Sequence, residues 1–204
     1  MFIGGKDNGK VFEYTLSTGF DVSTASFVDG FSISSQETHI SDLAFSTDGT
    51  KMFIVGTNSK SVFEYNLSTG FDVSTASYVD GFSVGSQETV PTGLEFSADG
   101  KRMFITGNNG DDVTEYKLTT AFDVSTASHV GQFDVSSQEM QASSIAFNAE
   151  GTKMFVLGYN GDDVNEYNLT SAFRVANDTG SVGSELVGAY AVSYTHLRAH
   201  ETVS

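Results

Sequence analysis

The amino-acid sequence repeats with a period of 51 residues, and this periodicity constrains the fold more than any other feature. Met-Phe, Glu-Tyr and the segment FDVSTAS recur in a fixed register, and the triplet SQE follows each complete FDVSTAS. A fixed period of this length is typical of a solenoid, a propeller or an array. The repeats begin at Met1, Met52, Met103 and Met154.

One unit, residues 40–89, contains four short segments with the composition of β-strands: SDLAFSTDG, TKMFIVG, VFEYNL and YVDGFSV. Phe63, Tyr65 and Leu67 alternate with other residues in the third segment, which places them on one face of a strand. Four antiparallel strands in roughly 40–50 residues is the size of a propeller blade. The sequence therefore predicts an all-β fold, an incomplete β-propeller of four-stranded blades, over residues 1–190.

The sequence of the predicted strand–turn–strand segment also supports this fold, because it resembles that of known propellers. GLEFSADGKRMFITG, residues 93–107, resembles the corresponding segment of YVTN and lactonase-like bacterial propellers. The whole repeat over residues 1–175 is also similar to repeat proteins of marine bacteria and their viruses. The resemblance implies a propeller, and it leaves the activity open because such propellers carry out many functions.

The repeat register also makes both ends of the sequence unusual. Met1 aligns with Met52, which lies inside the second predicted strand of a unit, so we expect that upstream sequence is missing. Near the other end, VSYTHLRAHET (residues 192–202) matches no repeat and resembles a translated sequencing adapter. We predict that residues 191–204 form a non-native tail. The alternative interpretation is a zinc site, because His196 and His200 are four residues apart.

The charge balance limits the kinds of partner. The chain has 26 acidic and 10 basic residues, a formal net charge of −16, and no cysteine. Such a surface repels nucleic acid and anionic membranes, and the apolar runs are too short for membrane insertion. We expect an extracellular, cell-surface or virion location, with a protein or glycan as the ligand.

A glutamate recurs on the third predicted strand of every unit, at Glu13, Glu64, Glu115 and Glu166. These residues could form a ring of carboxylates. We favour a structural interpretation, in which they pair with cations at the start of the preceding strand, because the hairpin register brings the two positions close. Those cations are Lys51, Arg102 and Lys153.

Two loops between the second and third strands contain paired carboxylates, in NNGDD and YNGDD. The loops vary between units, whereas FDVSTAS does not and is therefore expected to serve folding. The connections from the fourth strand to the next first strand vary too, and both variable sets lie at the same end of the strands, as a recognition surface requires. We predict binding residues at Asn109, Asp111, Asp112, Asn160, Asp162 and Asp163.

These oxygen-rich loops could hold Ca²⁺, although the same residues are ordinary turn chemistry, and no other cofactor is expected. His39 and His129 occupy different repeat positions, and no catalytic role is assigned to either. The near identity of the first three units favours a noncatalytic binding scaffold, since an enzyme needs one asymmetric site. A lactonase-like hydrolase is the alternative, and a purely structural spacer is a third interpretation. An open row of blades exposes unpaired sheet surface, so we expect self-association.

Overall fold

The computed structural model describes residues 1–176 and 191–193 and contains four antiparallel sheets. The first sheet has three strands, in the order β1-β2-β3. The second has four, in the order β4-β5-β6-β7. Their bounds are β1 (Phe2–Gly5), β2 (Lys10–Leu16), β3 (Ala25–Ser32), β4 (Ile40–Phe45), β5 (Lys51–Gly56), β6 (Ser61–Leu67) and β7 (Ala76–Ser83).

The third and fourth sheets repeat this pattern, in the orders β8-β9-β10-β11 and β12-β13-β14-β15. Within each sheet, every strand pairs with the next along the sequence, so the predicted four-stranded units are confirmed. The bounds are β8 (Pro91–Phe96), β9 (Arg102–Gly107), β10 (Asp112–Leu118), β11 (Ala127–Asp134), β12 (Ala142–Phe147), β13 (Lys153–Gly158), β14 (Val164–Asn168) and β15 (Ala191–Ser193).

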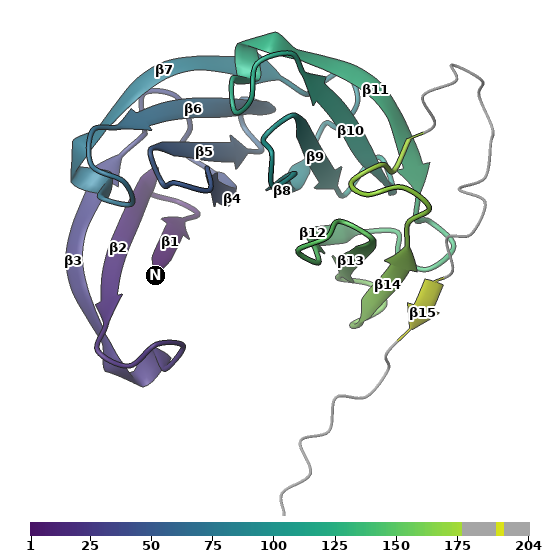
Figure 1. Ribbon diagram of the computed structural model, residues 1–204, viewed down its shortest axis with the longest axis horizontal. Coiled ribbons are helices and arrows are strands. Elements are labelled where there is room, and N and C mark those ends of the chain that lie inside the picture. The colour runs from purple at the N-terminus through teal and green to yellow at the C-terminus, as the bar shows by residue number, and fades with distance from the viewer. Residues whose placement is uncertain (177–190, 194–204) are drawn as a thin grey trace, which may run out of the picture.

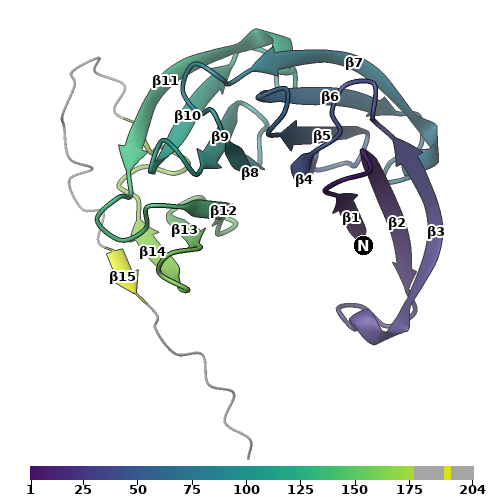
Figure 2. The same ribbon diagram turned by 180° about the vertical axis from the view of Figure 1, so that it is seen from behind.

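The four sheets follow one another around an arc, as Figures 1 and 2 show from opposite sides. Strands β4, β8 and β12 lie on the inner side of the arc, and β3, β7 and β11 lie on its outer rim. Among the described residues, no helix is long and apolar enough to cross a membrane.

The first sheet confirms the predicted register of the N-terminal residues. Phe2 on β1 pairs with Glu13, just as Phe53 on β5 pairs with Glu64. Strand β1 therefore occupies the second-strand position of its sheet, and β2 and β3 occupy the third and fourth.

Strand β15 is made of three residues from the segment predicted to be a non-native tail. Its backbone pairs with β14, with Glu166 opposite Val192 and Tyr167 opposite Ala191. The remainder of the segment, which includes His196 and His200, lies outside the described residues. The origin of residues 191–204 thus stays a prediction.

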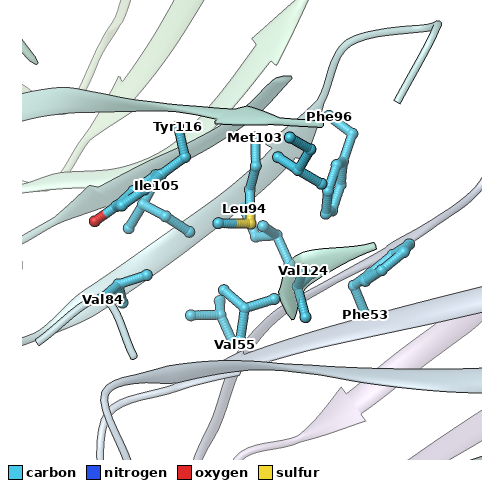
Figure 3. Close-up of a cluster of buried hydrophobic side chains, with 11 residues drawn as sticks. Phe53, Val55, Val84, Leu94, Phe96, Met103, Ile105, Tyr116 and Val124 are labelled. Atoms are coloured by element: carbon cyan, nitrogen blue, oxygen red, sulfur yellow. The ribbon is translucent and has the colours of Figure 1, made fainter. Parts of the chain in front are cut away.

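The core lies between neighbouring sheets, because the middle strands alternate their side chains between two faces that the adjacent sheets cover. Figure 3 shows one such layer, in which Phe53 and Val55 from β5 meet Leu94 from β8 and Ile105 from β9. Val124, from the 3-10 helix η3 (Val124–Thr126), completes the layer and is fully buried. Removal of this apolar surface from water is the main force that holds the sheets together.

The constant segment FDVSTAS builds the turn between the third and fourth strands. In the third unit, the carboxylate of Asp123 caps η3 by accepting a hydrogen bond from the amide of Ser125 at 3.2 Å. Phe122 has a positive φ of 56°, which turns its ring over Gly100. The aspartate cap recurs in η1 (Val22–Thr24) and η2 (Val73–Thr75), and the Phe71 ring lies over Gly49 in the same way, so this segment serves folding, as predicted.

Candidate functional site

The recurring third-strand glutamates are structural. Ion pairs join Lys51 to Glu64, Arg102 to Glu115 and Lys153 to Glu166, which confirms the predicted pairing. Sequence reasoning missed their second contact. The Oε2 atom of Glu115 accepts hydrogen bonds from the Val175 and Ala176 amides at 2.9 Å, which ties β10 to the next sheet. These carboxylates therefore hold the scaffold together.

The SQE glutamates hold the predicted binding loops. In the second of these triplets, Glu88 is buried, and its Oε1 accepts from the amide of Val90 at 2.6 Å. Its Oε2 accepts from the amide of Gly110 at 2.9 Å, in the loop between β9 and β10. Glu37 and Glu139 repeat this clamp. In the sequence, the only sign of this structural role is that the triplet SQE is identical in three units.

Hydrogen bonds to the clamp favour its charged form. Burial by itself raises the pKa of Glu37, but hydrogen bonds from Ser59, His39 and Thr38 outweigh that cost and leave the pKa below its ordinary value. A carboxylate that accepts several backbone amides is expected to behave in this way. The clamp fixes the backbone on both sides of the connection that it spans.

The six predicted binding residues divide into two separate groups. Asn109, Asp111 and Asp112 lie in the third unit, and Asn160, Asp162 and Asp163 lie in the fourth. Asp111 and Asp162 have positive φ values of 51° and 50°, at the turn position that Gly9 and Lys60 occupy in the other units. Their backbone geometry thus belongs to the turn itself.

The other members of these groups have partners within the loops. The Asn109 amide group donates to Thr89 at 2.7 Å, and the Asn160 backbone amide donates to Glu139 at 3.2 Å. Asp163 accepts from Asn165 at 2.8 Å. Over the described ranges, no set of three or more acidic or histidine side chains is placed to hold a metal ion.

Asp112 is the most perturbed of the six. Its side chain is buried and accepts from the Thr114 hydroxyl at 3.0 Å. Burial, with the nearby charges of Glu88, Asp134 and Asp111, raises the pKa of Asp112 to about 6 against the hydrogen bond from Thr114. Within the described part of the chain, the charged groups that raise the pKa of Asp112 are thus carboxylates.

A pocket of about 580 Å³ lies at the same end of the strands, nearer the inner side of the arc. We call it the axial pocket. Three repeat positions supply most of its wall. The first contributes Lys6, Thr57 and Asn108, the second contributes His39 and Val90, and the third contributes Ser41, Thr92 and Ser143.

The units differ from one another where they face the axial pocket. The position at the end of the second strand is a cation in Lys6, a hydroxyl in Thr57 and an amide in Asn108. The position before the first strand is an imidazole in His39 and an isopropyl group in Val90. A nearly symmetrical repeat thus builds an asymmetric polar wall.

His39 is held in the wall of the pocket by two contacts. Its backbone amide donates to Glu37 Oε1 at 2.7 Å, and its Nε2 atom lies 3.2 Å from Asp7 Oδ1. The sequence places His39 in a loop and assigns it no catalytic role, because it does not share a repeat position with His129; its contact with Asp7, 32 residues earlier, appears only in the structure. His129 lies on β11 against Tyr116, with ring centroids 5.8 Å apart.

No protein-family profile matches the chain, and no curated protein matches it either. Solved structures do match. A candidate 6-phosphogluconolactonase from Bacteroides uniformis aligns with 88% of this chain and 50% of its own length, at 11% identity and a TM-score of 0.61. The periplasmic gluconolactonase of Pseudomonas aeruginosa aligns with 86% of this chain and 48% of its own length, at 17% identity and a TM-score of 0.57.

A third structure, the Cps50 β-propeller domain from Myceliophteria thermophila, aligns with 83% of this chain and 49% of its own length, at 13% identity and a TM-score of 0.54. The chain has a β-propeller fold. It spans about half the length of these structures. At such low identity the likeness shows the fold alone.

Proposed function

We propose that this chain contributes the site of a lactonase-like hydrolase, and that the axial pocket is where its substrate binds. The observation that carries the proposal is the broken symmetry of that pocket. Positions that structure alone would keep equal instead hold Lys6, Thr57 and Asn108, which are three different polar groups. An enzyme needs such a wall to fix one orientation of one substrate.

The chemistry of the wall suits a small polyhydroxylated ring. Hydroxyl and amide side chains such as Ser41, Thr57 and Asn108 can donate to and accept from sugar hydroxyl groups. The volume of about 580 Å³ is ample for one sugar ring. Two of the most similar solved structures bear lactonase names, which supports this choice of reaction.

The His39–Asp7 pair provides a proton-transfer group for lactone hydrolysis. In the proposed step, His39 accepts a proton from water as the water oxygen attacks the lactone carbonyl carbon. The carbonyl oxygen becomes negatively charged, and the Lys6 ammonium stabilises it. The bond between carbonyl carbon and ring oxygen then breaks, and His39 returns the proton to that oxygen. Asp7 orients the imidazole.

The test is the rate of glucono-δ-lactone hydrolysis above the spontaneous rate, followed by acid release. We expect turnover that falls at least about hundredfold in His39→Asn, because general acid–base catalysis contributes this much. His129→Asn is the matched control, since His129 lies on β11 away from the pocket. Equal rates in both variants, or no turnover with the wild type, would reject the hydrolase.

A noncatalytic recognition scaffold is the second candidate, for a specific reason. The loops between second and third strands vary in sequence, while the buried Glu88 and Glu139 clamps hold them rigidly. A protein or glycan partner, or Ca²⁺, would contact Asp111 and Asp162 there. Calorimetry with Ca²⁺ on the wild type and on a variant with all four aspartates of the two loops changed to asparagine tests this proposal. Identical heats of Ca²⁺ titration in the two proteins would reject a Ca²⁺ site in these loops.

A further inference from the structure

A second pocket, of about 230 Å³, lies at the opposite end of the inner strands. It is bounded by the hairpins that join first to second strands and by the turns that follow the third strands. Five phenylalanine rings line it, and we call it the phenylalanine pocket. The rings are those of Phe45, Phe96, Phe122, Phe147 and Phe173.

The rings come from three consecutive units, and four of them form two tilted pairs. Phe96 and Phe122 have centroids 5.7 Å apart, and Phe147 and Phe173 have centroids 5.4 Å apart. The positive φ of Phe122 and Phe173 directs their rings toward the hairpins. These walls are a product of the repeat, so they are expected to be rigid.

Glu95 is the lining residue with the largest chemical departure from the repeat. Its equivalents in the second and fourth units are Ala44 and Ala146. Among the described residues that line the phenylalanine pocket, Glu95 alone carries a carboxylate, and none is lysine or arginine. The other polar groups of the wall are the neutral side chains of Thr47, Ser97 and Asn148, so the negative charge of Glu95 has no basic partner in this wall.

The surroundings of Glu95 add to that unbalanced charge. Its Oε1 atom accepts from the Phe96 amide at 3.1 Å. Burial raises the pKa of Glu95, and the charge of Asp42 on the neighbouring strand β4 raises it further. Asp42 itself accepts from the amides of Leu43 and Leu94 at 2.8 and 2.9 Å. A cation in the pocket would stabilise both carboxylates.

We propose that the phenylalanine pocket binds a small organic ammonium ion of the methylated-amine class. The faces of aromatic rings attract a cation, and the attraction is greatest when the cation is weakly hydrated and leaves water easily. A metal ion would instead need several oxygen ligands, and this wall offers one carboxylate. The net charge of −16 concentrates cations near the surface. This site is independent of the hydrolase proposed for the axial pocket.

The experiment is calorimetric titration of the whole chain with tetramethylammonium chloride and choline chloride. The neutral analogue of choline, 3,3-dimethylbutan-1-ol, and KCl serve as comparison ligands. We expect saturable binding of both ammonium ions, with at least about tenfold weaker binding of the neutral analogue and of K⁺. Absence of binding, or equal affinity for the neutral analogue, would overturn the proposal.

Variants separate the carboxylate from the aromatic walls. Glu95→Gln keeps the shape of the side chain, and Glu95→Ala installs the residue of the equivalent positions, so both are expected to fold. Each should weaken ammonium binding at least about tenfold and leave lactone hydrolysis unchanged. Asp162→Asn, which removes an exposed charge at the opposite end, is the control and should bind as the wild type does.

The pH dependence of binding gives an independent readout. Because protonation removes the charge of Glu95, affinity should fall as the pH is lowered through its raised pKa, with Asp42 contributing to the same titration. Glu95→Gln should flatten this dependence. Unchanged affinity in Glu95→Gln at neutral pH would show that the carboxylate is not part of the site and would reject the proposal.

Discussion

Glu64 on β6 and Val124 in η3 belong to different repeat units, and the Glu64 Oε2 atom accepts a hydrogen bond from the Val124 amide at 3.1 Å. The other oxygen of the same carboxylate pairs with Lys51. The Glu64 side chain is 2% exposed. One buried residue therefore links a hairpin to the turn of the next unit, and Glu13 and Glu115 do the same for their own neighbours.

Loss of this link should destabilise the protein. Glu64→Ala leaves the Val124 amide and the Lys51 ammonium without their partner, so we expect a loss of about 3 kcal/mol in the free energy of unfolding, measured with urea. Glu64→Gln keeps an acceptor for the amide and should lose less. Glu150→Ala, at an exposed position, should change stability by no more than about 0.5 kcal/mol. Equal losses in all three variants would contradict a structural role for the contact.

Gly100 is required by both its backbone angle and its neighbour. Its φ is +67°, and a Cβ atom built there would lie 2.2 Å from the ring of Phe122. Gly100→Ala should therefore lower the free energy of unfolding by about 2 kcal/mol or more. Gly19→Ala is the matched control, because a Cβ atom at Gly19 has nothing within 4 Å. Thermal unfolding of the two variants checks the difference, and similar midpoints would refute it.

Asp112 should make stability depend on pH. Burial raises its pKa in the folded protein to about 6, above the ordinary value of 3.8. Between these values the folded state holds the proton more tightly than the unfolded state, so stability falls as the pH rises through this window. Asp112→Asn should remove that fall and gain roughly 1–2 kcal/mol at pH 7. Urea unfolding at pH 4 and pH 7 measures the free energy of unfolding of each protein. Asp162→Asn is the control, and its stability should still fall between the two pH values.

The Glu88 clamp should control local opening of the loop between β9 and β10. Glu88→Ala removes the acceptor of the Gly110 amide, which is bound at 2.9 Å. We expect hydrogen exchange at that amide to accelerate at least about tenfold, because local opening then costs less free energy. Exchange at Gly161, held by Glu139 in the next unit, should stay slow. An unchanged rate at Gly110 would show that other contacts hold the loop.

The outward face of the first sheet should drive self-association. Val22 is 70% exposed, whereas its repeat equivalents Val73 and Val124 are fully buried against the preceding sheet. Phe20 beside it is also fully exposed. A variant with both Phe20→Ser and Val22→Ser should shift the sedimentation distribution toward the monomer. Val79→Ser, at a 41% exposed position on β7 of the second sheet, serves as the control, and an equal shift there would contradict the assignment.

Sequence periodicity determined the local architecture. Strand positions, hairpin register and the pairing of Glu64 with Lys51 all depend on residues within one unit, and a period of 51 residues exposes them directly. The turn formed by FDVSTAS could also be predicted, because this segment is identical in three units and is rich in residues that cap turns. By contrast, the role of Glu88 was hidden, because its partner Gly110 lies in the following unit and a backbone amide has no sequence signature.

The tertiary structure alone shows which polar residues line the same pocket. Lys6, His39 and Asn108 are far apart in the chain, and they meet in the axial pocket because consecutive sheets place equivalent positions side by side on the inner side of the arc. Glu95 meets Phe147 and Phe173 for the same reason. In the sequence, these differences between units cannot be distinguished from the ordinary divergence of repeated segments. In the folded arc, the residues that differ between units line the same pocket and make it asymmetric. The shape of such a pocket depends on distances between units, and the sequence of one repeat carries no information about those distances.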